Sequence, residues 1–288
     1  MGEYKTDRVL AGRIRMHILD WPHNGDDPPV LFVHGITGSG MAGLRLGNLL
    51  AGRRRVISPD LRGHGWSDMP FSEYGVAAHA KDLILCMDRL GIQRFVVTGH
   101  SLGGIIGLYI AAQYPDRVTG LIMFDSGAVA PDSAWRLLVS YYEGTRYHYN
   151  SLDEYVSRFK NSPLYQPWTE ELEALVLSNL FRQPDGTYTR QIPRYVLETD
   201  LHSLTPESRE KLAELYPKIE CPVLIFRASM GLFGPGSMVL PDESLSALLH
   251  AIPSAQAITI EEASHTSLLT IPCEARDRAI VKFLGLET

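Results

Sequence analysis

The stretch Gly99-His100-Ser101-Leu102-Gly103 decides how the rest of this 288-residue sequence is interpreted. It follows the apolar run Phe95-Val96-Val97, which predicts a buried strand, and it leads into a helical pattern that continues to Tyr114. A serine on a sharp turn between a strand and a helix presents its hydroxyl above the sheet, and small residues two positions away let the backbones pass closely. The flanking elements therefore predict that Ser101 is a nucleophile surrounded by amides of a helix N-terminus.

Strand and helix patterns alternate on both sides of this turn. An alternating stretch at 8–19 predicts an opening antiparallel hairpin. Behind it, we expect strands at 30–33, 55–59, 94–98 and 118–124, and helices at 76–90 and 101–114. Alternation of this kind indicates an α/β fold with a parallel sheet and right-handed crossovers.

The middle of the chain has a different pattern of apolar residues. Between residues 128 and 215 no apolar run is typical of a buried parallel strand, and helical patterns recur at 133–147, 152–159, 169–181 and 206–215. Strand and helix signals return with strands at 221–226 and 257–260 and helices at 242–251 and 273–283. We therefore predict a core formed by residues 1–127 and 216–288, interrupted by a helical cap at 128–215.

Composition narrows the range of partners and compartments. The formal net charge is -6 and the longest basic run is Arg53-Arg54-Arg55, so the chain offers no extended basic field for nucleic acid. No stretch is long enough to cross a bilayer, and the amino terminus lacks a signal-peptide segment. Three widely spaced cysteines show no metal-ligand spacing and predict a reduced, cytoplasmic protein without a metal. We expect a monomer or a homodimer.

A serine hydroxyl needs a base near pH 7, and the best candidate is His265. It lies in Glu262-Ala263-Ser264-His265-Thr266, on the loop after the last predicted strand. The alternative for His265 is an ordinary surface histidine. Three other histidines sit inside turns and are interpreted as positioning residues: His34, His64 and His100.

The acid that orients the histidine has two possible locations. Asp125 follows the strand at 118–124 and stands before Ser126-Gly127, where its alternative role is to cap a turn. The loop after Phe226 contains no carboxylate until Asp242 and Glu243, which resemble a helix start. We therefore choose Asp125 as the third member.

Two backbone amides are expected to stabilise an oxyanion. One belongs to Leu102, directly after the nucleophile. The other belongs to Ile36, in the loop after the first parallel strand, where Gly35 lets the backbone turn sharply. Thr37 follows in the same loop and is a candidate for substrate contact.

The motifs, taken in order, resemble the α/β-hydrolase superfamily. They are His34-Gly35, Asp60-Leu61-Arg62-Gly63-His64-Gly65-Trp66-Ser67, the glycine turn around Ser101 and Ser264-His265. The resemblance implies a mostly parallel eight-stranded sheet flanked by helices, with an inserted helical cap and no cofactor. Many relatives carry the acid after the seventh strand, whereas Asp125 follows the sixth. That placement is similar to some lactone and enamide hydrolases, including the acetamidomethylene-succinate hydrolases.

The cap and one loop carry the information on substrate. Twelve of the 61 residues from Trp135 to Tyr195 are aromatic, against 9% of the whole chain, which favours a partly hydrophobic small molecule. Trp135 and Tyr141 are candidates for contact with it. Two alternatives stay open for Arg227: it binds a substrate carboxylate, or it pairs with an acid of the protein. The loop at 231–236 could be a mobile wall of the site.

These features predict a serine hydrolase that cleaves a small-molecule ester, lactone, amide or activated carbon-carbon bond through an acyl-enzyme. Two alternatives remain. The first is a ligand-binding protein on the same scaffold with slow turnover. The second is an acyltransferase or lyase that uses the same residues.

Overall fold

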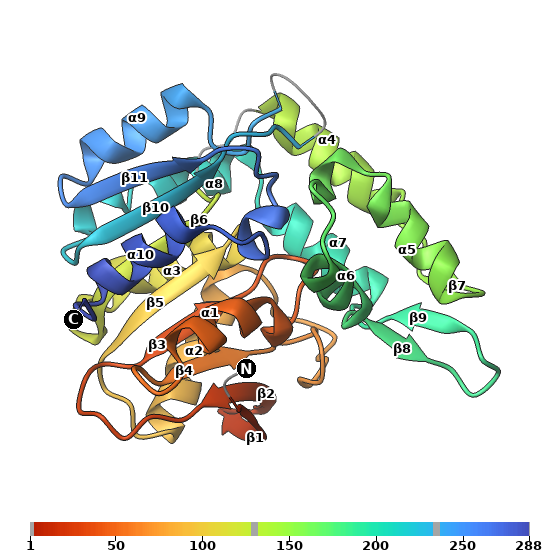
Figure 1. The fold of residues 1–288 in the computed structure, drawn as a ribbon, viewed down its shortest axis with the longest axis horizontal. Coiled ribbons are helices and arrows are strands. Elements are labelled where there is room, and N and C mark those ends of the chain that lie inside the picture. The colour runs from red at the N-terminus through yellow and green to blue at the C-terminus, as the bar shows by residue number, and fades with distance from the viewer. Residues whose placement is uncertain (1–2, 128–131, 233–236, 288) are drawn as a thin grey trace.

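The computed structural model describes residues 3–127, 132–232 and 237–287 (Figure 1). Its centre is an eight-stranded sheet in the order β1-β2-β4-β3-β5-β6-β10-β11. β1 and β2 form the predicted antiparallel hairpin, and every pair from β4 to β11 along this order is parallel. The strands are β1 (Lys5–Ala11), β2 (Ile14–Trp21), β3 (Val30–Val33), β4 (Val56–Pro59), β5 (Phe95–His100), β6 (Val118–Phe124), β10 (Val223–Ala228) and β11 (Ala255–Ile260).

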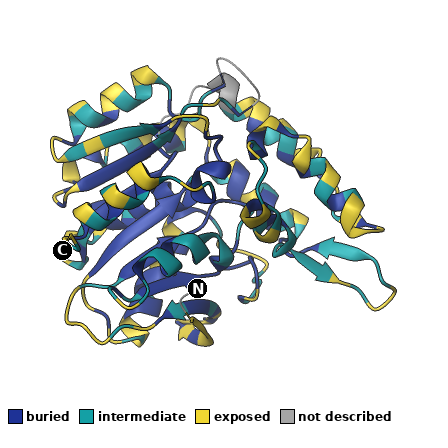
Figure 2. Ribbon diagram, in the orientation of Figure 1, coloured by how far each residue is buried: buried dark blue, intermediate teal, exposed yellow. Residues whose placement is uncertain are grey.

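Helices cover both faces of this sheet because successive strand residues point to opposite sides. Leu31 and Ile225 belong to a hydrophobic cluster with residues of α2 (Val76–Arg89), α3 (Leu102–Gln113) and α9 (Asp242–Ala251). Their neighbours Phe32 and Leu224 belong to a second cluster with residues of α1 (Leu44–Leu50) and α10 (Glu274–Phe283). The central strands are buried on both faces (Figure 2), as continuous apolar runs predict. The α/β fold with a mostly parallel eight-stranded sheet is confirmed.

The described chain between β6 and β10 leaves the sheet and forms α4 (Asp132–Glu143), α5 (Leu152–Lys160), α6 (Glu170–Leu177) and α7 (Arg194–Ser203), which lie to the right in Figure 1. A further helix, α8 (Pro206–Ala213), follows before the chain returns to β10. Ser151, Thr169 and Thr205 cap the N-termini of α5, α6 and α8 by accepting hydrogen bonds from backbone N–H groups. We call residues 132–213 the inserted segment.

The inserted segment also contains a small sheet that the helical patterns did not predict. β7 (His148–Tyr149), β8 (Leu180–Arg182) and β9 (Tyr188–Arg190) pair antiparallel in the order β7-β9-β8. These strands have two or three residues each, which is too short for a recognisable alternation. Helices α1 and α7 were likewise not predicted. Five short 3₁₀ turns complete the described structure, at Gly40–Gly43, Pro115–Arg117, Pro163–Tyr165, Tyr216–Lys218 and Ser267–Leu269.

Candidate active site

Ser101 occupies the turn between β5 and α3, with φ 54° and ψ -120°. A positive φ is uncommon for a residue with a side chain and costs about 1–3 kcal/mol, and such strain concentrates at functional sites. The turn is packed closely against the loop after β3. A Cβ at Gly103 would lie 2.0 Å from the carbonyl oxygen of Val33 and 2.6 Å from that of His34. Only glycine fits at this position, so the sequence forces the turn that exposes the serine.

Asp125 and His265 form a buried pair at the adjoining end of the sheet. Asp125 follows β6 directly, and its Oδ2 accepts a hydrogen bond from His265 Nδ1 at 2.8 Å. Its Oδ1 accepts a second one from the Ala228 backbone N–H at 3.1 Å. Both side chains are at most 5% exposed. The two acceptor oxygens are thus each assigned to one donor, which fixes the orientation of the carboxylate and of the imidazole.

The loop that carries His265 is fastened from two sides. His100 Nε2 donates a 2.7 Å hydrogen bond to the His265 carbonyl oxygen. Burial holds the pKa of His100 well below its usual range, so the ring is a neutral donor. From the inserted segment, the carbonyl of Leu164 accepts from Ser264 and that of Gln166 accepts from Ser267. The His265 side chain is therefore held in place through its backbone as well as through Asp125.

Ile36 and Leu102 line a cavity together with Ser101, and their backbone amides have no acceptor among the described residues. Within the described residues, neither Ile36 N–H nor Leu102 N–H donates a hydrogen bond, although both residues are at most 5% exposed. The carbonyl of Ile36 is bound by His64 Nε2 at 2.8 Å, which holds the loop in place. Gly35 packs closely against the nucleophile turn, since a Cβ would lie 3.0 Å from the His100 ring and 3.3 Å from the Ser101 Cβ. Buried amides without partners are rare, and a pair of them suits an oxyanion.

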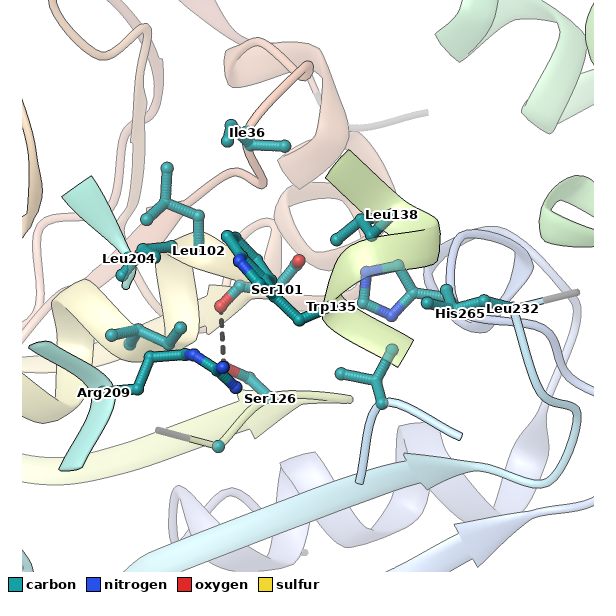
Figure 3. A pocket seen from close by; sticks show the side chains of 13 residues that line it. Ile36, Ser101, Leu102, Ser126, Trp135, Leu138, Leu204, Arg209, Leu232 and His265 are labelled. Atoms are coloured by element: carbon teal, nitrogen blue, oxygen red, sulfur yellow. Dashed lines mark hydrogen bonds between the residues drawn. The ribbon is translucent and has the colours of Figure 1, made fainter. Parts of the chain in front are cut away.

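Two cavities meet at Ser101 and His265. The first is lined mainly by apolar side chains, among them Leu102, Trp135 and Leu138 (Figure 3). The second is lined by tyrosines and polar groups besides apolar ones. Ile36, Ser101 and His265 line both cavities. In the described part of the chain no hydrogen bond joins the Ser101 hydroxyl to His265, and such contacts are often loose before substrate binds.

Most of the residues predicted for the site lie together in the structure. Ser101, His265, Ile36, Leu102 and Trp135 line the first cavity. The second cavity is lined by Gly35 and Thr37 from the loop after β3. Part of the predicted loop at 231–236 falls on 233–236, outside the described residues, while Leu232 lines the first cavity.

Two predicted substrate contacts are not brought to either cavity. Arg227 forms an ion pair with Asp242, whose side chain is 91% exposed, so the structure favours the protein-acid alternative. Asp242, an alternative candidate for the acid that orients the histidine, is therefore paired with Arg227. Tyr141 is absent from the lining of both cavities, and its ring packs on the neighbouring Tyr142 at 5.4 Å. Tyr142 lines the second cavity instead, because the next residue of a helix points about 100° away.

Two further residues that line the second cavity, Tyr142 and Arg190, were not predicted from sequence patterns. Tyr142 is buried, and burial raises the pKa of its hydroxyl to about 12. Arg190 ends β9 and is 7% exposed. The density of aromatic residues indicated that the inserted segment contributes to substrate binding. Neither side chain could be assigned to the site, because the sequence does not show how this segment folds over it.

Among the described residues, no group of three or more His, Cys, Asp and Glu side chains is arranged to hold a metal ion. None of the described helices combines the length and the apolar composition needed to span a membrane.

Comparison with known proteins gives the family. The model of the alpha/beta hydrolase fold family matches residues 28–272. An uncharacterized protein of Mycobacterium tuberculosis strain H37Rv is 40% identical over 108 residues, which cover 38% of this chain and 32% of that protein. A 2-(acetamidomethylene)succinate hydrolase of Mesorhizobium japonicum is 35% identical over 118 residues, 41% of each chain. The aligned part of this chain thus spans a third to two fifths of the length of these relatives.

Solved structures agree with this assignment at the level of the fold. The crystal structure of E-2-(acetamidomethylene)succinate hydrolase superposes with a TM-score of 0.83 at 24% identity, covering 98% of this chain and all of that one. An α/β hydrolase from Novosphingobium aromaticivorans superposes with a TM-score of 0.81 at 22% identity over the whole of both chains. With the family model covering most of the sequence, this chain belongs to the α/β-hydrolase fold family, as its glycine turn, sheet order and site geometry indicate.

Proposed function

We propose that this protein is a serine hydrolase that cleaves a small-molecule carbonyl compound through an acyl-enzyme. One observation carries the proposal: Ser101 stands on a strained turn and shares a cavity with His265, whose Nδ1 is bound by the buried Asp125. A nucleophile, a base and an orienting acid are the three parts that acyl transfer at neutral pH requires. The full-length superposition on a hydrolase fold supports the same reaction class.

In the proposed reaction, His265 Nε2 takes the proton of the Ser101 hydroxyl as its oxygen attacks the substrate carbonyl. The negative charge that develops on the carbonyl oxygen is stabilised by the Ile36 and Leu102 amides, which have no other acceptor among the described residues. His265 then protonates the leaving group. Water, activated by His265, releases the acyl group from Ser101. Asp125 stabilises the imidazolium throughout by accepting from Nδ1.

We also propose that residues 128–215 act as a cap over a core made of 1–127 and 216–288. Trp135, Leu138 and Leu204 from the inserted segment line the first cavity together with Ser101 of the core. A site enclosed between two layers excludes water and selects its substrate by shape. The mainly apolar lining of this cavity suits a partly hydrophobic substrate with an ester, lactone, amide or activated carbon-carbon bond.

The proposal is tested with 4-nitrophenyl butyrate, a small activated ester with an apolar acyl chain. We expect many turnovers per enzyme molecule in the wild type and none above background in Ser101→Ala. Ser126→Ala is the matched control, because Ser126 lines the same cavity but its hydroxyl donates to the Ser101 carbonyl oxygen at 2.6 Å. It should retain turnover.

Three other results would contradict or redirect the proposal. Stoichiometric labelling of Ser101 without turnover favours a ligand-binding protein, and turnover that survives in Ser101→Ala excludes the nucleophile. Products that contain an added alcohol or amine acceptor in place of water favour an acyltransferase.

A further inference from the structure

Arg190 is a buried cation that points into the candidate active site. It ends β9 of the inserted segment, is 7% exposed and lines the second cavity together with Ser101 and His265. Its backbone N–H is bound by the Tyr147 carbonyl at 3.0 Å, which anchors the strand behind the side chain. A guanidinium stays charged at every physiological pH, so a full positive charge faces this cavity.

Within the described residues, the Arg190 guanidinium lacks the carboxylate and carbonyl acceptors that bind the buried Arg62 and Arg276. The Arg62 guanidinium is bound by both Asp82 oxygens, and that of Arg276 is bound by Asp277 and two carbonyl groups. Among the described residues, no carboxylate oxygen lies within 4.0 Å of Arg190, and its buried Nε has no hydrogen-bond acceptor.

Tyrosine rings are the main surroundings of this guanidinium. Its carbon lies 5.8 Å from the Tyr147 ring centroid, and Tyr155 and Tyr165 also line the cavity. The face of an aromatic ring attracts a cation but offers its N–H groups no acceptor. Burying a charge without an opposite charge is costly, so the environment is incomplete as it stands.

The two cavities at Ser101 differ in the chemistry they offer. The first is bounded mainly by apolar side chains such as Trp135 and Leu138, and its one arginine among the described lining residues, Arg209, lies over the Trp135 ring at 5.3 Å. The second holds Arg190 with Thr37 and Asn179. A carboxylate matches a guanidinium in charge and can accept two parallel N–H groups.

We propose that Arg190 binds a carboxylate of the substrate, and that the scissile carbonyl at Ser101 lies between this anion and an apolar group in the first cavity. The inference rests on the proposed hydrolase function and specifies its substrate class: a carboxylate-bearing ester, amide or lactone. In this proposal the substrate carboxylate is bound by Arg190 and not by Arg227, which pairs with Asp242.

The first test uses the wild-type protein and pairs of activated esters. Each pair consists of the 4-nitrophenyl monoester of succinic, glutaric or adipic acid and the same ester with a terminal carboxamide. Rates measured with Ser101→Ala are subtracted, because the free carboxylate can assist its own hydrolysis. A hydrogen bond to a charged group contributes roughly 1.5–3 kcal/mol, so we expect kcat/KM about 10- to 100-fold higher for the carboxylate of at least one pair.

The second test assigns that preference to Arg190. Arg190→Met should bring the carboxylate-to-carboxamide ratio of kcat/KM close to 1, and Arg190→Lys, which keeps the charge but loses the fork, should give an intermediate ratio. Arg146→Met is the matched control. Arg146 is a 58% exposed arginine of the inserted segment that pairs with Glu154, and its loss should leave the ratio unchanged.

The outcomes separate this inference from the proposed function. Ser101-dependent turnover without a preference for any carboxylate overturns the inference and leaves the hydrolase intact. A preference that persists in Arg190→Met also overturns it. Absence of Ser101-dependent turnover with every ester contradicts the proposed function itself. Where Arg190→Met fails to fold, the ratio in Arg190→Lys and the competition between glutarate and glutaramide in the wild type decide.

Discussion

Replacing Asp125 with asparagine should almost abolish turnover while leaving the fold in place. The reason lies in the two donors that face this carboxylate. Oδ1 accepts from the Ala228 backbone N–H, which cannot change its role, and Oδ2 accepts from His265 Nδ1. An asparagine must therefore turn its oxygen toward Ala228 and its NH₂ group toward His265.

This orientation selects the wrong tautomer of His265. Facing an NH₂ donor, Nδ1 must be the acceptor, so the proton moves to Nε2 and that nitrogen can no longer take the proton of Ser101. In a well-studied triad the same exchange lowers kcat about 10⁴-fold, which corresponds to about 5 kcal/mol of barrier. We expect a loss of this order with 4-nitrophenyl butyrate and a cost in unfolding free energy of roughly 1–3 kcal/mol.

The chain contains a matched control for this change. Asp200 also accepts from a buried histidine, His79 Nε2 at 3.0 Å, and from a backbone N–H, that of Gly75. Neither Asp200 nor His79 lines the two cavities at Ser101. Asp200→Asn should lower stability by a similar amount and kcat by less than about 10-fold. Equal kcat losses in the two variants, or full activity in Asp125→Asn, would refute the reasoning.

Three further perturbations test the structure around the site. Gly103→Ala brings a Cβ to 2.0 Å from the Val33 carbonyl oxygen and should lower the urea midpoint of unfolding markedly. Gly107→Ala in the same helix is the control, because its Cβ meets only side-chain atoms, the nearest at 3.2 Å, and it should be nearly neutral. Equal midpoints in the two variants would contradict the close packing of the turn. Arg227→Ala should change kcat/KM less than twofold because Arg227 pairs with Asp242 outside both cavities, and a large loss would restore it to the site. Burial lowers the pKa of His34 to about 3, so between pH 6.5 and 3 the folded state binds fewer protons than the unfolded state. The free energy of unfolding should therefore fall as the pH falls, by up to about 1.4 kcal/mol per pH unit for this group. The fall should be shallower in His34→Gln, and identical slopes in the two proteins would contradict this.

The sequence predicted the parts of the site that depend on strand ends. Ser101 and Asp125 each come directly after a strand, and the carboxyl ends of parallel strands meet at one edge of the sheet. The glycines around Ser101 are required by close packing, since a Cβ on Gly103 would lie 2.0 Å from the Val33 carbonyl oxygen. Short-range patterns were sufficient here because a strand end and the glycines that follow it can be recognised from neighbouring residues.

The parts that were missed depend on long-range packing. Arg227 lies near the end of β10, but its partner Asp242 lies 15 residues away at the start of α9, and only the structure shows that the two meet. Tyr141 and Tyr142 differ by one helical step, which a sequence pattern does not resolve. Arg190 lies on a three-residue strand, and its lack of an acid partner is a property of the folded inserted segment.

The central claim is that Ser101 forms a covalent acyl-enzyme, and rapid-quench mass spectrometry with 4-nitrophenyl butyrate measures this directly. Within the burst of nitrophenolate we expect a butyryl adduct of one per chain, mapped to the peptide that contains Ser101, and its decay should match the steady-state rate. The adduct should be absent from Ser101→Ala. Turnover without any adduct, or an adduct mapped to another residue such as Ser126, would contradict the account.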